Sequence, residues 1–295
     1  MPNQLPSPGA VFLDHVAHFV PEVEAAAAAL ERCGFRLTPF TAQTNRVDGM
    51  PVPAGTGNRC AMLRQGYVEI LTATADTELA RQLRERIADH VGLHLAAFSS
   101  ADAGAEHRRL TAAGFATLPL VDMRRPVATE SGNEDARFTI ARIAHGGMPE
   151  GRVQFLTHHT ERLVWRDGFL DHPNGAQALT GLWIAAVDPA EPAERFARFT
   201  GRPACRAGEV TTVALDRGTV HIARPPYLND AFGVAAAGRL PCFVAAQIAV
   251  KSLAEITRHL AAASVAFRQI RLDEGDAIAA ILPAALSGTM LFHAG

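Results

Sequence analysis

The sequence predicts an α+β protein in which one strand–helix–strand–strand–strand unit occurs four times. Four short apolar runs with strand character, LDHVAHFV, GLHLAAFS, GLWIAAVD and AAQIAVKS, each precede a helical segment. Four further runs, GYVEILTA, GRVQFLTH, GTVHIARP and GTMLFHAG, each open with a glycine and close one unit. The units start about 79, 89 and 64 residues apart, counted between His15, His94, Trp183 and Gln247.

Helix start and stop signals follow the first strand of each unit. The first helix is expected between Pro21, which suits a first turn, and Gly34, which suits a terminator. Ser100 or Asp102 is expected to cap the second helix, and Ser252 the fourth. Each unit therefore combines one helix with four strands.

The length of 295 residues favours two domains of two units each. A charged amphipathic helix over 76–90 is expected to link the first two units, and the stretch 161–180, rich in turn dipeptides, to separate the domains. The predicted domains are 1–165, with units at about 11–75 and 90–160, and 176–295, with units at about 180–225 and 240–295.

Composition excludes several classes of function. A net charge of −2, with no basic stripe, argues against partners such as nucleic acid or anionic membranes. No apolar run approaches the roughly 20 residues that span a bilayer, and the N-terminal segment does not resemble a secretory signal, so a cytoplasmic location is expected. The cysteines are isolated and typical of a reduced core: Cys33, Cys60, Cys205 and Cys242. No phosphate-binding, dinucleotide-binding or serine-hydrolase motif is present.

Glu69 is an unusual residue for the segment Gly-Tyr-Val-Glu-Ile-Leu. In a strand it shares a face with Tyr67 and Leu71, and the opposite face is also apolar. A buried carboxylate costs several kcal/mol unless a cation or donors meet it. Three explanations follow: Glu69 faces water, pairs with an arginine, or binds a metal.

The four units, with LDHVAHFV in a first strand, GYVEIL in a closing strand and ILPAALSGTMLFHAG at the end, resemble the vicinal oxygen chelate superfamily and its glyoxalase-like domain proteins. This resemblance covers nearly the whole chain and implies two paired, cupped mixed β-sheets. It does not fix the reaction, because the family includes lyases, isomerases, epimerases, dioxygenases and binding proteins.

The resemblance also implies metal ligands on the first and last strands of each unit. In the first domain these positions hold two imidazoles, a carboxylate and an amide, which suit one divalent Zn, Ni, Mn or Fe ion: His15, Glu69, His94 and Gln154. Gln154 is either the fourth ligand or a donor to substrate, and a displaced Glu69 would serve as the base. The second domain offers Trp183, His221, Gln247 and Leu291, which should hold no metal.

Further side chains are candidates for substrate contact. Arg59 and Arg124, the latter in the pair Arg124-Arg125, would bind a carboxylate or phosphate, or else pair with Glu69. Phe19 and Phe98 repeat at the same offset from the two histidines, and His158 lies on the Gln154 face at the expected rim. The alternatives are a surface or loop role for the arginines and a solvated strand end for His158.

Three functions are consistent with these residues. The first is a metal-dependent glyoxalase-like enzyme that chelates two neighbouring oxygens of a small substrate and stabilises an enediolate-like anion. The second is an extradiol-type ring-cleaving dioxygenase, whose metal the family places in the second half. The third is a metal-free protein that sequesters a small molecule. The linker lengths allow units to pair within one chain or across a homodimer.

Overall fold

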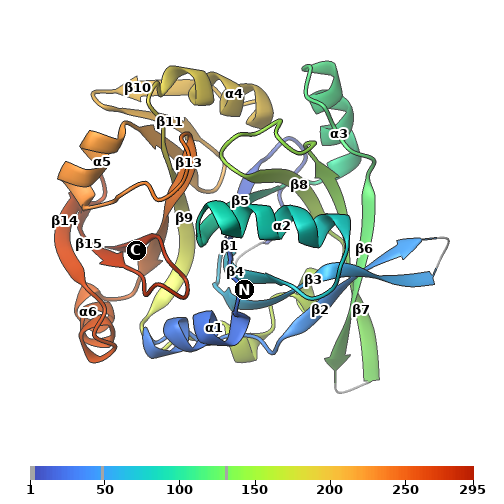
Figure 1. Cartoon of the computed structure of the whole chain (residues 1–295), viewed down its shortest axis with the longest axis horizontal. Helices are drawn as coiled ribbons and strands as arrows, with labels where there is room; N and C mark the ends of the chain where they lie inside the picture. Colours follow the sequence, from blue (N-terminus) through green and yellow to red (C-terminus); the bar gives the residue numbers. More distant parts are fainter. Residues whose placement is uncertain (1–3, 48–49, 130–131) are drawn as a thin grey trace.

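The computed structural model describes residues 4–47, 50–129 and 132–295, which form two eight-stranded sheets side by side (Figure 1). The first sheet closes into a barrel with strand order β1-β4-β3-β2-β6-β7-β8-β5. Its strands are β1 (Phe12–Phe19), β2 (Thr41–Val47), β3 (Met50–Met62), β4 (Tyr67–Ala73), β5 (Gly92–Ser99), β6 (Val121–Thr129), β7 (Gly132–Arg142) and β8 (Arg152–His158).

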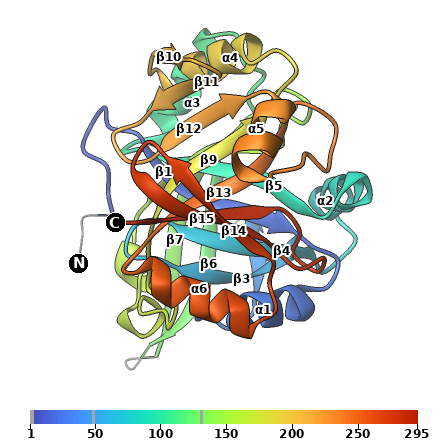
Figure 2. The ribbon, with the colours of Figure 1, turned by 90° about the vertical axis from the view of Figure 1, so that its left-hand side faces the viewer.

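The second sheet is open, with the order β10-β11-β12-β9-β13-β16-β15-β14. Figure 2 shows it in front of the first. Its strands are β9 (Ala176–Ala185), β10 (Ala204–Ala207), β11 (Val210–Ala214), β12 (Thr219–Ala223), β13 (Cys242–Val250), β14 (Phe267–Leu272), β15 (Gly275–Ile281) and β16 (Thr289–Ala294).

The predicted fold class is confirmed, with the same pairing scheme in all four units. The first strand of each unit runs parallel to its last strand, as in β1–β4, β5–β8, β9–β12 and β13–β16. Antiparallel pairing of first strands, β1 with β5 and β9 with β13, joins the units in pairs. The first sheet differs from an open cup because β2 meets β6 at Asn45 and Met123 and closes it.

Side-chain caps start three of the helices. Asp102 accepts hydrogen bonds from the backbone N–H groups of Gly104 and Ala105, while Thr77 and Ser252 cap the second and last helices. The helices are α1 (Val23–Arg32), α2 (Glu78–Asp89), α3 (Ala103–Ala112), α4 (Ala190–Thr200), α5 (Pro225–Phe232) and α6 (Leu253–Ala262), with 3₁₀ turns at Glu161–Leu163 and Asp167–Phe169. In the described part of the chain, no helix has both the length and the apolar character that crossing a bilayer requires.

Buried apolar side chains form three clusters. The largest lies between the two sheets and contains residues from both, such as Phe98, Phe199 and Phe292. A second cluster lies inside the first barrel and a third inside the curve of the second sheet. Both faces of the central strands are therefore apolar, which explains why β5 and β13 are buried along their whole length.

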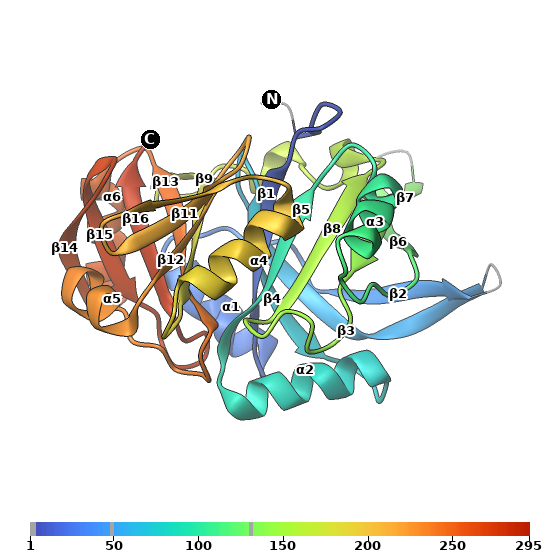
Figure 3. The same ribbon diagram turned by 90° about the horizontal axis from the view of Figure 1, so that it is seen from above.

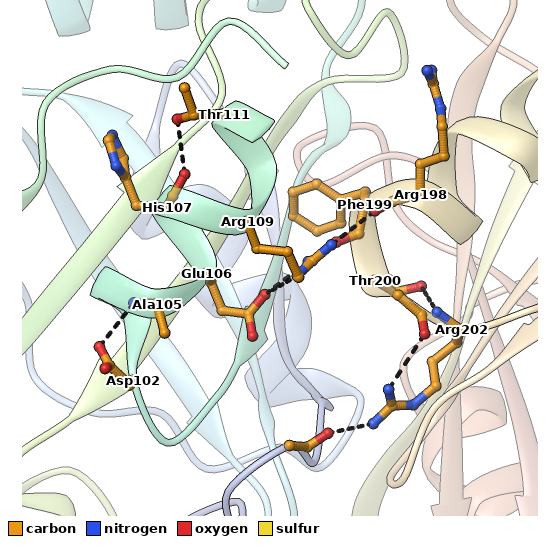
Figure 4. Close-up of polar contacts among 12 residues, drawn as sticks. Asp102, Ala105, Glu106, His107, Arg109, Thr111, Arg198, Phe199, Thr200 and Arg202 are labelled. Carbon is orange, nitrogen blue, oxygen red and sulfur yellow. Dashed lines mark hydrogen bonds and ion pairs between the residues drawn. The ribbon is translucent and has the colours of Figure 1, made fainter. Parts of the chain in front are cut away.

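Polar contacts add to the packing between the two halves. Arg109 on α3 donates to the backbone carbonyls of Arg198, at 2.9 Å, and of Phe199, at the C-terminal end of α4 (Figure 4). A cation there complements the negative end of the helix dipole. Seen from above, α4 lies between the sheets (Figure 3). A second contact between the halves is made by His18 of β1, which donates from Nδ1 to the Leu286 carbonyl at 3.1 Å.

The burial of His18 predicts that acid destabilises the fold. Burial lowers the pKa of His18 to about 4, although its hydrogen bond to Leu286 acts in the opposite direction. A lowered histidine pKa stabilises the fold fully above the unfolded value near 6.5, and this contribution is lost as pH falls toward 4. At 1.36 kcal/mol per pKa unit, the loss amounts to about 3 kcal/mol.

Urea unfolding of the wild type and of His18→Gln, at pH 7 and pH 4.5, measures this effect. We expect a smaller drop in the free energy of unfolding for the variant. His107→Gln, an exposed histidine on α3, should leave the drop unchanged, and equal drops in all three proteins would contradict the assignment.

Candidate functional site

The first barrel encloses a cavity lined by both polar and apolar side chains. It contains about 830 Å³ of non-atom space, part of it open to solvent. Leu79 of α2 contributes to one side. The polar and charged residues of the lining are His15, Gln43, Thr44, Asn58, Tyr67, Glu69, Arg124, Arg125, Arg142, Arg152 and Gln154.

His15 is held by a fully buried carboxylate. The β1–β5 register shifts between Leu13 and His15, so that Asp14 occupies an irregularity in the strand. Oδ1 of Asp14 accepts from Nδ1 of His15 at 2.7 Å, and Oδ2 accepts from Nε2 of His158 at 2.9 Å. Because a carboxylate only accepts, Nδ1 of His15 carries the hydrogen, and Nε2 is left to face the cavity.

The surroundings of Asp14 keep it ionised. Burial alone would raise the pKa of Asp14, but the charge of His158 and hydrogen bonds from both histidines hold it far below its usual range. His15 also stacks on Tyr67, with ring centroids 4.3 Å apart and planes 17° apart. The imidazole is thus fixed in tautomer and in orientation.

Glu69 faces the same cavity and is held by amide donors. Its Oε1 accepts from the side-chain amides of Asn58 and, at 3.4 Å, of Gln43, while Oε2 lies 3.9 Å from Nε2 of His15. Asn58 and Glu69 are 5% and 4% exposed. Among the described residues no arginine forms an ion pair with Glu69, so the hydrogen bonds to this buried carboxylate come from the neutral amides of Asn58 and Gln43.

Arginine side chains dominate the charge of the cavity. Arg124 lies 3.4 Å from Asp122, but no described residue forms a hydrogen bond or an ion pair with the guanidinium group of Arg125, Arg142 or Arg152. Burial, reinforced by the charge of Arg142, lowers the pKa of Arg152 to about 9, so it remains protonated at pH 7. Four guanidinium groups against one lining carboxylate give a cavity suited to anions.

His94 does not reach this cavity. Leu95 and Ala97 of β5 point into the barrel, whereas Ala96 and Phe98 join the cluster between the sheets. Nε2 of His94 instead hydrogen-bonds to the His90 carbonyl at 2.7 Å. Both faces of β5 are apolar, so the two-residue alternation alone does not identify the inward one. Leu95, which pairs with Arg152 on β8, stands one residue beyond His94 on the inward face.

The other expected substrate contacts are also placed differently, with the exception of Arg124. Arg59 points out of the barrel and bridges Glu24 and Glu31 of α1 at 2.9 and 2.8 Å. His158 is buried behind His15 rather than at a rim.

The two phenylalanines that repeat in sequence lie in different clusters. Phe98 packs on Phe155 and Phe199 between the sheets. Phe19 lines a neighbouring cavity and lies beneath the guanidinium of Arg152, 5.3 Å from the ring centroid.

The corresponding positions of the second half contact one another. Trp183 donates from Nε1 to the side-chain oxygen of Gln247 at 3.0 Å and stacks on His221, with ring centroids 4.3 Å apart. Gln247 in turn donates to Glu274. Phe232 of α5 packs edge-on against Trp183, and Leu291 belongs to the same apolar cluster.

Sequence reasoning missed Asp14, Asn58, Arg142 and Arg152 as site residues. A signal existed for Arg152, which precedes Gln154 by two residues and so shares its face. No such signal existed for Asp14, because strict alternation would point it away from its neighbour His15.

A family model described as a glyoxalase-like domain matches residues 13–200. The chain belongs to the glyoxalase-like domain family. No curated protein matches it. The glyoxalase-like match spans the whole first barrel, including the cavity, and continues through α4.

Solved structures share the fold at low identity. A hypothetical protein from Staphylococcus aureus superposes with a TM-score of 0.67 at 10% identity, covering 97% of this chain and 100% of its own. A mutant 4-hydroxymandelate synthase from Streptomyces coelicolor superposes with a TM-score of 0.58 at 13% identity, and the match covers 97% of this chain and 93% of that protein. A Mn(II)-bound glyoxalase from Novosphingobium aromaticivorans superposes with a TM-score of 0.56 at 10% identity, covering 96% of this chain and 81% of its own. At such identities the likeness concerns the fold alone.

The residues present offer an incomplete ligand set for a resident divalent cation. Only His15, Glu69 and the neutral Gln154 of the predicted ligand set line the cavity, and Leu95 lies on the inward face of β5 in place of His94. Among the described residues no cluster of three or more His, Cys, Asp or Glu side chains is arranged for a metal. Four nearby guanidinium groups further oppose a bound cation.

Replacing the central carboxylate tests its role. Asp14→Asn should lower the free energy of unfolding by about 3 kcal/mol, because it removes one member of a buried charged network. The wild type should lose this contribution as pH falls below about 3.9, since the pKa of Asp14 is lowered by folding. Urea unfolding measures both effects.

Asp76→Asn, which changes a carboxylate with 98% side-chain exposure, serves as the control and should shift stability by less than about 0.5 kcal/mol. If the two variants are equally stable, Asp14 does not hold the histidines as described.

Proposed function

We propose that this glyoxalase-like chain binds a small organic carboxylate in the first barrel and that His15 moves a proton on it without a resident metal. The observation that carries the proposal is the meeting of an imidazole whose orientation is fixed with three half-buried guanidinium groups, of Arg125, Arg142 and Arg152, that form no hydrogen bond or ion pair with described residues. Withdrawing a cation from water without an opposite charge beside it is costly, and an anionic ligand would offset that cost.

Binding would rely on charge and geometry together. A guanidinium group presents two parallel N–H donors that match the two oxygens of a carboxylate. Arg142 and Arg152 lie at neighbouring strand ends, close enough for the charge of one to affect the pKa of the other. They are suited to hold one carboxylate between them, with Gln154 available as an additional amide donor.

The chemical step would be general acid–base catalysis. Nε2 of His15 takes a proton from the carbon next to a carbonyl or carboxylate, so that a C–H bond breaks and an N–H bond forms. Asp14 stabilises the imidazolium, and the guanidinium groups stabilise the developing enolate. Return of the proton to another carbon gives isomerisation, whereas loss of a group from the adjacent carbon gives elimination.

A metal-dependent enzyme remains the second candidate. It is favoured by the 3.9 Å separation of Nε2 of His15 and Oε2 of Glu69, a spacing at which both atoms can approach one ion. The Mn(II)-bound state of one structural relative points the same way. For a dioxygenase, a 2-His-1-carboxylate set is the usual iron site, and this cavity offers a single histidine and a single carboxylate.

Proton exchange provides the test of the proposed chemistry. Protein treated with EDTA should accelerate the exchange of α-protons of 2-oxo acids such as 2-oxobutyrate or 2-oxoglutarate for deuterium, followed by proton NMR. His15→Gln should reduce the rate about 100-fold or more, because general-base catalysis contributes that much. His107→Gln should retain the wild-type rate.

Binding, measured separately by calorimetry, separates the outcomes. Binding that depends on Arg152 but is accompanied by no exchange would replace catalysis with simple sequestration. If Arg152→Met binds every acid as well as the wild type does, the proposal is wrong.

Metal content distinguishes the first candidate from the second. Untagged protein dialysed against Zn²⁺, Ni²⁺, Mn²⁺ or anaerobic Fe²⁺ should carry well below one ion per chain by elemental analysis. One ion per chain in the wild type, absent from Glu69→Gln, would establish the metal-dependent enzyme instead.

A further inference from the structure

The arginines of the cavity form two groups that are separated along the strands. On β6, Arg124 pairs with Arg137 of β7 and Arg125 pairs with Ala136. Arg142 lies six residues beyond Ala136 at the far end of β7. At about 3.3 Å per residue, the two groups enter the barrel at points about 20 Å apart along the strand.

Local electrostatics agree with this separation. Burial and the charges of Arg142, Glu69 and Arg86 act on the pKa of Arg152. Arg125 instead acts on Tyr67 and Cys60, where its charge opposes the rise in pKa that burial causes. The pair Arg142/Arg152 and the pair Arg124/Arg125 thus form separate positive regions of one cavity.

Apolar side chains occupy the wall between these regions. Leu95, Met123, Phe138, Ile140 and Leu156 line the cavity from four different strands. Such a surface favours methylene or aromatic carbon over further charge.

The row of strand pairings that contains His15 ends at one of these two regions. Gln154 pairs with Arg142 across β7 and β8, and with Ala97, which pairs in turn with His15. These residues form one row across four strands. The Arg142/Arg152 region would therefore hold the reacting end of a ligand, and the Arg124/Arg125 region a remote end.

We propose that the ligand is a dianion whose two anionic groups are separated by an apolar segment, as in an α,ω-dicarboxylate. This inference rests on the proposed function and specifies its substrate class. Arg152 binds the end at which the proton is moved, and Arg125 determines specificity by binding the second anionic group.

Paired acids of equal chain length test the proposal. Glutarate, adipate and suberate are compared with pentanoate, hexanoate and octanoate by calorimetry, on the wild type and on Arg125→Met and Arg152→Met. At least one diacid should bind about ten-fold or more tightly than its monoacid, because it gains a charge-assisted, bidentate contact. Arg125→Met should abolish this preference and leave the affinity for monoacids unchanged, whereas Arg152→Met should weaken both classes.

Controls separate this inference from folding defects and from the proposed function. Arg258→Met changes an exposed arginine on α6 and should bind like the wild type. The melting temperatures of the ligand-free cavity variants should equal or exceed that of the wild type, since each removes a charge that has no partner among the described residues.

If monoacids and diacids bind equally well and both lose affinity in Arg152→Met, the ligand is not a dianion, but the proposed function stands. If neither variant weakens binding, both the dianionic ligand and the proposed function are wrong.

Discussion

The site depends on the Asp14 carboxylate, which two histidines share. Strict strand alternation would point Asp14 away from His15, and only the irregularity in β1 lets the two side chains meet. With His158 on its other oxygen, Asp14 fixes which nitrogen of His15 faces the cavity. Hydrogen bonding to Asp14 and stacking on Tyr67 together fix the orientation of the reactive group.

The carboxylates of the cavity have partners within the protein, whereas most of its guanidinium groups do not. Asp14 and Glu69 are both satisfied internally, by histidines and by amides respectively. Arg125, Arg142 and Arg152 are half-buried and form no hydrogen bond or ion pair with described side chains, so an anion bound beside them would be stabilising. A cluster of charged groups without hydrogen-bond partners is typical of a functional site, because natural sequences otherwise satisfy their buried polar groups.

Much of the fold could be predicted from the sequence, because the repeated strands, glycines and helix caps are local signals. Where both faces of a strand are apolar, alternation does not show which face points into the cavity. His15, Glu69 and Gln154, three of the predicted ligands, line it. His94 does not, because the inward face of β5 carries Leu95 and Ala97. Which sheet covers each face of a strand depends on the tertiary structure, and the two-residue alternation in the sequence does not show it.

The two halves show how one scaffold supports different interiors. His15 stacks on Tyr67 in the first half, and Trp183 stacks on His221 in the second, with ring centroids 4.3 Å apart in both pairs. In the second half an indole replaces the imidazole, and Phe232 from α5 fills the space beside it. The same stacked arrangement therefore occurs in the first unit of each half. Acid–base chemistry requires additional features that this stack does not supply, namely an irregular strand that places a carboxylate behind the ring and arginines in front of it.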